Sequence, residues 1–239
     1  MKNQNQKTRS TFLRSGVDKG QVRPLRLPSS GVLSTVFLFA FVVWTVLVKT
    51  VGVKAIGPNG SSVGFARLNA VVRDFTGYNH ALYVLTDWLG LVPVGVALCF
   101  ATVGLAQLIK RKSLLKVDPD ILLLGAFYVA LGVVYVLFEK VKINFRPVLI
   151  EGILETSYPS STTLLVACIM PTAIMQFNAR IKNQTARKIA CVTATVFTAF
   201  MVVGRVVAGV HWITDIIGGV LISMGLVLAY YHFMVKFSK

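Results

Sequence analysis

The sequence predicts an all-α, polytopic membrane protein with about six transmembrane helices that form one bundle. Of its 239 residues, 55% are hydrophobic and only 14% are charged, and the mean hydropathy is +0.70. A soluble domain carries about a quarter charged residues. The apolar residues also come in runs of membrane-spanning length rather than in short periodic stretches. Together, the low charge and the long runs indicate an integral membrane protein.

The chain divides into a basic arm, residues 1–30, and a membrane domain, residues 31–239. The arm holds seven lysines and arginines, one acidic residue (Asp18) and no apolar periodicity. We therefore expect it to be disordered and to lie on the inner leaflet. The apolar run from Gly31 to about Val53 is too long for a signal peptide and lacks a small-residue cleavage site. It predicts a first transmembrane helix that is retained.

The next elements follow a turn-rich break at residues 57–62. Apolar residues spaced among polar ones over residues 63–79 predict a short amphipathic helix at the membrane interface. The second span covers about residues 81–109, and its excess length indicates a tilt or an interfacial start. Four further spans are predicted at about residues 121–138, 159–177, 189–203 and 216–235.

Six spans place both termini on the same side of the membrane. Of the 25 lysines and arginines, 17 fall on the side of the termini and eight on the other side. The positive-inside rule therefore predicts cytoplasmic termini. We expect the membrane to be the inner or plasma membrane of a bacterium. The loops that hold Arg146, Ser160 and His211 then all face the extracytoplasmic side.

The net charge of +16 would suggest nucleic-acid binding in a soluble protein. Here the basic residues cluster between hydrophobic spans, where they set topology and meet lipid headgroups, so we expect no nucleic-acid partner. Cys99, Cys168 and Cys191 lie in apolar runs without CxxC spacing, which favours inert packing over a disulfide or a metal site. A transporter is disfavoured, because no span is interrupted at mid-bilayer in two matching halves.

Three polar segments on the predicted outer face carry residues suited to phosphate chemistry. Arg146 and Arg205 supply planar guanidinium groups that match phosphate oxygens. The run Pro159-Ser160-Ser161-Thr162 opens a helix, whose free N–H groups and hydroxyls form an anion site. Taken singly, each has an ordinary explanation as a loop charge, a helix cap or an interfacial residue. Their shared location favours phosphoryl transfer.

His211 and Asp215 supply the nucleophile and the group that orients it. They are four residues apart, so on a helical turn they share a face and the carboxylate can hold the imidazole. Together with Arg205, these residues lie between two apolar flanks, residues 189–203 and 216–235. Three charged or titratable side chains are costly to place there in a membrane and so indicate function.

These residues resemble the motifs of the type 2 phosphatidic acid phosphatase superfamily, which includes lipid phosphate phosphatases and relatives of vanadium haloperoxidases. That family carries K-x6-R-P, P-S-G-H and S-R-x5-H-x3-D in this order in a six-helix membrane core. The third motif matches at Arg205, His211 and Asp215, the second at Pro159 and Ser160, and the first at Arg146 and Pro147. The resemblance covers roughly residues 30–235.

By this resemblance, His211 attacks phosphorus and forms a phosphohistidine while Asp215 holds the ring. The resemblance implies neither a metal nor another cofactor. Phosphate oxygens would be held by residues of all three motifs: Arg146, Ser160, Ser161, Thr162, Arg205 and, as substitutes for the first-motif lysine, Lys140 and Lys142.

The chain departs from the family at four positions. Glu139 stands where the family has lysine, Ser161 stands for the motif glycine, and Gly204 stands for the motif serine. Thr162 stands where the family has the histidine that protonates the leaving group, and a threonine hydroxyl is too weak an acid to replace it. Such an acid contributes about 10²–10⁴-fold to the rate. His80, at the outer start of the second span, is an alternative acid.

The missing acid bears on the substrate. A lipid monophosphate must expel an alkoxide, which needs a proton, whereas a lipid diphosphate expels a phosphate. We therefore expect a membrane lipid phosphatase that prefers a polyprenyl diphosphate, such as the undecaprenyl carrier of the cell envelope, on the outer face. The alternative is a degenerate member that binds a phospholipid or diphosphate headgroup without turning it over.

Overall fold

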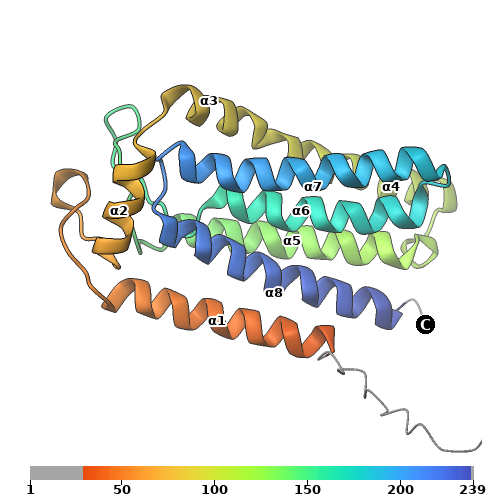
Figure 1. Cartoon of the computed structure of the whole chain (residues 1–239). Coiled ribbons are helices and arrows are strands. Elements are labelled where there is room, and N and C mark those ends of the chain that lie inside the picture. Colours follow the sequence, from red (N-terminus) through yellow and green to blue (C-terminus); the bar gives the residue numbers. More distant parts are fainter. Residues whose placement is uncertain (1–28, 238–239) are drawn as a thin grey trace, which may run out of the picture.

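The computed structural model describes residues 29–237, and this part of the chain folds into helices that run nearly side by side (Figure 1). It contains six helical segments that are long and apolar enough to cross a membrane, and no β-strand beyond isolated bridges. The predicted all-α, six-span fold is confirmed. The eight α-helices are α1 (Ser30–Thr50), α2 (Ala66–Thr76), α3 (His80–Leu89), α4 (Leu91–Arg111), α5 (Pro119–Lys140), α6 (Ser161–Arg180), α7 (Gln184–Val207) and α8 (Ile213–Phe237). Residues 1–28 of the predicted basic arm lie outside the described part.

The second span consists of two helices, α3 and α4, which meet at Gly90. Pro93 lies in the first turn of α4, where its missing N–H leaves the carbonyl of Leu89 without the usual helical bond. The excess length noted in the sequence is therefore α3, a separate short helix at one end of the bundle.

The centre of the bundle is formed by α6 and α8, which are the most buried of the spans. In Figure 1, α7 lies along one side of α6, while α1 lies along α8. Leu164 and Ile169 of α6 pack with Ile222 of α8 and Phe41 of α1 in the main apolar core. This packing fixes the start of α6 relative to the start of α8, where the polar motifs lie.

α2 crosses the end of the bundle at which α6 and α8 begin (Figure 1). It lies within the predicted amphipathic segment, residues 63–79, but is shorter. The Asn69 side chain donates to the Gly64 carbonyl (2.7 Å) and to the Thr214 hydroxyl (3.0 Å), and its oxygen accepts from the Thr214 N–H (3.3 Å). These bonds attach α2 to the first turn of α8.

The opposite end of the bundle is joined by an ionic cluster, the Asp118 cluster, formed by Gln107, Arg111, Asp118, Asp120 and Arg180. Asp118 accepts from Arg111 (2.8 Å), Gln107 (2.8 Å) and Arg180 (3.1 Å). Arg180 also pairs with Asp120 at 2.7 Å. The cluster ties α4, α5 and α6 together at the end away from the polar motifs.

Candidate active site

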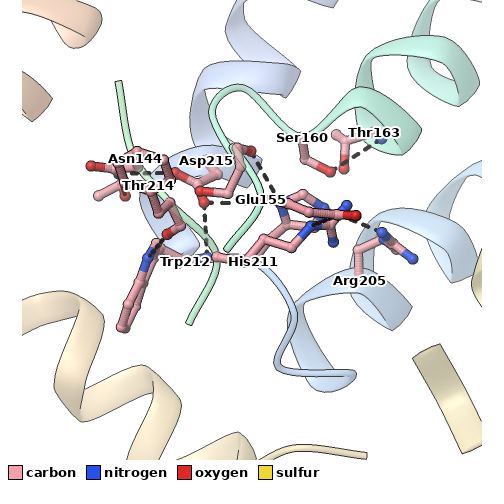
Figure 2. A network of polar contacts seen from close by, with 12 residues as sticks. Asn144, Glu155, Ser160, Thr163, Arg205, His211, Trp212, Thr214 and Asp215 are labelled. Carbon is pink, nitrogen blue, oxygen red and sulfur yellow. Dashed lines mark hydrogen bonds and ion pairs between the residues drawn. The ribbon is translucent and has the colours of Figure 1, made fainter. Parts of the chain in front are cut away.

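The three sequence motifs meet at the end of the bundle where α6 and α8 begin, as Figure 2 shows for His211, Asp215, Ser160 and Arg205. The connection between α5 and α6 reaches this end by two backbone bonds: Arg146 N–H to the Glu155 carbonyl (2.9 Å) and Ser157 N–H to the Asn144 carbonyl (2.9 Å). These bonds bring the first and second motifs side by side.

The second motif approaches α8 closely at Gly218. Tyr158 is buried, and a Cβ atom at Gly218 would lie 2.7 Å from its ring. The Tyr158 hydroxyl bonds the Thr45 hydroxyl of α1 at 2.7 Å, and burial raises the pKa of the tyrosine. Glycine at position 218 thus lets the segment before α6 lie directly on α8.

His211 lies in the turn between α7 and α8, with its side chain almost fully buried. Its Nδ1 is 3.1 Å from the Ser157 carbonyl, and its Nε2 is 3.2 Å from a terminal nitrogen of Arg205. Because a carbonyl and a guanidinium cannot exchange roles, the proton belongs on Nδ1 and the lone pair on Nε2. The imidazole is therefore held as the tautomer whose free lone pair is on Nε2.

The environment of His211 favours the neutral ring. Burial, together with the positive charges of Arg146 and Arg205, holds the pKa of His211 well below its usual 6.5. A neutral imidazole keeps its lone pair, which a nucleophile requires.

Asp215 is fully buried in the first turn of α8, next to His211. Its carboxylate accepts from the Trp212 N–H (3.0 Å) and from the Asn144 amide (3.0 Å), and it lies 3.9 Å from Nδ1 of His211. The prediction that His211 and Asp215 lie on one helical turn is wrong, because α8 begins at Ile213, after His211. The two side chains still lie close, but the direct bond to the imidazole comes from Ser157.

Arg205 lies in the last turn of α7 and is buried, with 1% of its surface exposed. One terminal nitrogen contacts His211, while the other donates to the Thr86 hydroxyl (3.3 Å) and lies 3.6 Å from Asp87. Its Nε is buried without a hydrogen-bond partner among residues 29–237. An anion at this point would satisfy that donor.

Arg146 is mostly buried and pairs through Nε with the Glu155 carboxylate at 2.9 Å. Its Nη1 is a second buried donor without a hydrogen-bond partner in the described part of the chain. A buried, unsatisfied charged donor is costly unless a ligand satisfies it. The two arginines together therefore indicate an anion site.

The residues of the second motif have different positions. Ser160 is fully buried and caps α6: its hydroxyl accepts from the Thr163 N–H (3.4 Å), and its own N–H donates to the Asp215 carbonyl (3.1 Å). Ser161 and Thr162, in the first turn of α6, line a cavity instead. First-turn N–H groups have no partner within the helix and so suit an anion.

This cavity has a volume of about 720 Å³, and we call it the headgroup cavity. Arg146, Arg205, Ser161 and Thr162 line it, and so do three carboxylates, Asp87, Glu139 and Glu155. His211 lines an adjoining narrow cleft that shares Ser161 and Glu139 with the cavity. A phosphate group in the headgroup cavity would therefore lie beside His211.

Residues 126–239 match the family described as the PAP2 superfamily, and this region contains all three motifs. This match assigns residues 126–239 to the PAP2 superfamily. A solved PAP2 structure, described as the first transmembrane PAP2 type phosphatidylglycerolphosphate phosphatase from Bacillus subtilis, shares the fold. The two chains are 19% identical with a TM-score of 0.50, and the alignment covers 85% of this chain and 96% of that one. No curated protein gave a significant match.

Three of the substitutions in the family's motifs, Ser161 among them, line the headgroup cavity. Thr162 occupies the position of the second-motif histidine and faces the headgroup cavity. Glu139 occupies the position of the first-motif lysine and lines both the cavity and the cleft of His211. Lys140 and Lys142 are exposed and line neither space, because they lie at and beyond the end of α5. They do not replace the missing lysine in this structure.

His80 is exposed at the start of α3, where its ring bonds the Tyr78 hydroxyl at 3.0 Å. It is absent from the lining of the headgroup cavity, so the structure does not bring it to the site.

Sequence reasoning missed two groups that contact His211 and Asp215. Asn144 binds Asp215, and the carbonyl of Ser157 binds His211. Asn144 precedes Arg146 by two residues, and this closeness to a motif was the one available signal. The contact from Ser157 could not be predicted, because every residue has a backbone carbonyl.

Proposed function

We propose that this protein is a membrane lipid phosphatase whose nucleophile is Nε2 of His211. The observation that carries the proposal is the placement of this nitrogen, which lies 3.2 Å from a terminal nitrogen of Arg205. Arg205 and Arg146 both line the adjoining cavity, and each has a buried donor without a hydrogen-bond partner among residues 29–237. A nucleophile beside preorganised cationic donors is the arrangement that phosphoryl transfer requires.

In the proposed first step, Nε2 of His211 bonds to phosphorus and the bond from phosphorus to the leaving oxygen breaks. Arg146, Arg205 and the first-turn N–H groups of α6 stabilise the equatorial oxygens. Nδ1 keeps its proton against the Ser157 carbonyl, and Asp215, 3.9 Å away, stabilises the positive ring. Water then attacks phosphorus, the phosphorus–nitrogen bond breaks, and inorganic phosphate leaves.

The preferred substrate in this proposal is a polyprenyl diphosphate. Thr162 cannot protonate an alkoxide, whose conjugate acid is very weak. Attack on the terminal phosphorus of a diphosphate expels a lipid monophosphate instead, and phosphate monoesters have a second pKa of about 6. The reaction then proceeds without the acid that a monophosphate substrate needs.

The second candidate function is a headgroup-binding protein without turnover. It is favoured by Glu139, which puts a negative charge where the family has a positive one, and by Asp87 and Glu155 in the same cavity. Three carboxylates weaken the attraction of the cavity for phosphate.

Phosphate release by purified protein distinguishes the two functions. We expect wild type to hydrolyse a polyprenyl diphosphate faster than phosphatidate or phosphatidylglycerolphosphate, and His211→Ala to abolish all release. Thr162→His should raise the monophosphate rates by up to about 10²–10⁴-fold and change the diphosphate rate little. Equal background release by wild type and His211→Ala would leave only the binding function. Faster release from phosphatidate by wild type would exclude the diphosphate preference.

A further inference from the structure

A second large cavity, of about 660 Å³, lies between α4 and α5, and we call it the α4–α5 groove. Except for Tyr128, every residue that lines it is apolar or glycine. The Tyr128 hydroxyl contacts Thr172 of α6 at 3.1 Å, so it already has a polar partner. The lining therefore suits a hydrocarbon ligand.

The groove adjoins the headgroup cavity. Val94 of α4 lines both spaces. Leu91 of α4 and Gly132 of α5, which lie toward the active-site end of the same two helices, line the headgroup cavity. A molecule with its phosphate in the headgroup cavity would thus meet the groove directly as it leaves that cavity.

The groove extends farther than one leaflet. On α4 its lining runs from Val94 to Leu108, which at 1.5 Å per residue is about 21 Å. The hydrocarbon core of a bilayer is about 30 Å thick, so one leaflet is about 15 Å. Leu114 and Val117, in the connection at the far end of the bundle, also line the groove. A chain that fills it must pass the middle of the membrane.

We propose that the α4–α5 groove binds the single hydrocarbon chain of the substrate and selects chains longer than one leaflet. This inference rests on the proposed function, since it places the reacting phosphate in the headgroup cavity. It deepens that function by assigning recognition of the long polyprenyl chain to α4 and α5. An ordinary acyl chain of the outer leaflet would be too short to fill the far half of the groove.

Gly125 of α5 allows a direct test. It lines the groove six residues from the start of α5, about 9 Å from the end that lies away from the active site. A Cβ atom there would meet nothing within 4 Å, so a side chain at position 125 has room to enter the groove, and Gly125→Leu should narrow it. Gly95 of α4 is the matched control: it also has open space around its Cβ and lines neither cavity.

The measurement is kcat/KM for farnesyl diphosphate, as the short substrate, and for undecaprenyl diphosphate, as the long one. We expect Gly125→Leu to lower the ratio of long to short by about tenfold, in the range that one extra group in an apolar pocket produces. Gly95→Leu should leave the ratio unchanged. An unchanged ratio in Gly125→Leu would overturn the proposal.

A binding assay separates this inference from the proposed function. If wild type and His211→Ala show the same background hydrolysis, the phosphatase function fails, and the groove is then tested by binding alone. Competition of the two diphosphates against a fluorescent lipid diphosphate on His211→Ala protein should show the same loss of long-chain preference on adding Gly125→Leu. Equal preference with and without that substitution would overturn the groove assignment.

Discussion

At the scale of single residues, the site depends on the protonation of one imidazole. Ser157 fixes the proton of His211 on Nδ1, and burial with Arg146 and Arg205 lowers its pKa well below 6.5. A protonated ring would lose its lone pair and would carry a positive charge next to a guanidinium group. The local structure thus favours the neutral ring, which is the form that the proposed reaction requires, at neutral pH.

We expect the His211 ring to stay neutral as the pH falls from about 7.5 to 6.5, the usual pKa, and to be protonated only below that range. The sequence has three histidines, so replacing His80 and His232 by glutamine leaves a single histidine for an NMR titration. The nitrogen shifts should also show a protonated Nδ1. Arg205→Gln, as the comparison, should raise the pKa toward 6.5 without reaching it, because burial remains. A midpoint at or above 6.5 in the protein with Arg205 intact would contradict this description.

At this scale, the sequence predicted that the polar residues of the three motifs lie on one face. The apolar spans must cross the membrane, so the polar segments between them are restricted to its two faces. This restriction brings together Arg146, Arg205, His211 and Asp215. The sequence could not decide which of Glu139, Lys140 and Lys142 faces the cavity. That choice depends on where α5 ends, and helix ends are the least certain feature of a pattern.

At the scale of elements, the sequence predicted the spans but not their interruptions. The apolar run of the second span is continuous through Gly90, so only the structure shows that α3 and α4 are separate. Their separation has a consequence for the site. Thr86 and Asp87 lie at the end of α3, where they contact Arg205. The sequence pattern of the second span, taken as one helix, gave no reason to expect that Thr86 and Asp87 contact Arg205.

The Asp118 cluster joins α4, α5 and α6 without touching the site, so it should affect stability alone. The Arg111 hydrogen bond, aided by Arg180 and Gln107, holds the pKa of Asp118 below its usual 3.8. Its folded pKa is depressed, so the stabilisation is present above pH 3.8 and lost as the pH falls through the lower, folded pKa.

We expect Asp118→Asn to lower the free energy of unfolding by about 1 kcal/mol, since the carboxylate is about one-third exposed. For a chain of this length that corresponds to a fall in Tm of about 2–4 °C, measured in detergent. Asp74→Asn, which alters an exposed carboxylate of α2, should leave Tm unchanged. The value of kcat/KM should be unaffected in both variants. A lower kcat/KM in Asp118→Asn at unchanged Tm would contradict a purely structural role.

At the scale of the whole molecule, the fold was predictable because a bilayer allows few solutions. Long apolar runs must become helices, since helices satisfy every backbone group within one segment. The arrangement of those helices was not predictable in the same way. Nothing in the sequence pattern of α4 and α5 distinguishes a surface that contacts lipid from the α4–α5 groove, because both are apolar. Only the spacing between the helices does so.

The orientation of the molecule in the membrane is predicted from the distribution of lysines and arginines alone. The active-site end of the bundle holds the loop with Glu151, and the other end holds the turn with Lys112. Because 17 of the 25 lysines and arginines belong to the arm, the C-terminus and the turns at the latter end, we expect that end to be cytoplasmic. The headgroup cavity then opens on the extracytoplasmic side.

Labelling of single cysteines in intact cells tests this orientation. With Cys99, Cys168 and Cys191 replaced by alanine, Glu151→Cys should react with a membrane-impermeant maleimide, because Glu151 is exposed near the active-site end. Lys112→Cys, equally exposed at the other end, should react only after the membrane is permeabilised. Replacing Lys110, Arg111 and Lys112 by glutamine removes three of the 17 charges and should weaken the bias without reversing it, since the other inner segments remain. The opposite labelling pattern would place the site in the cytoplasm and would exclude a substrate presented on the outer leaflet.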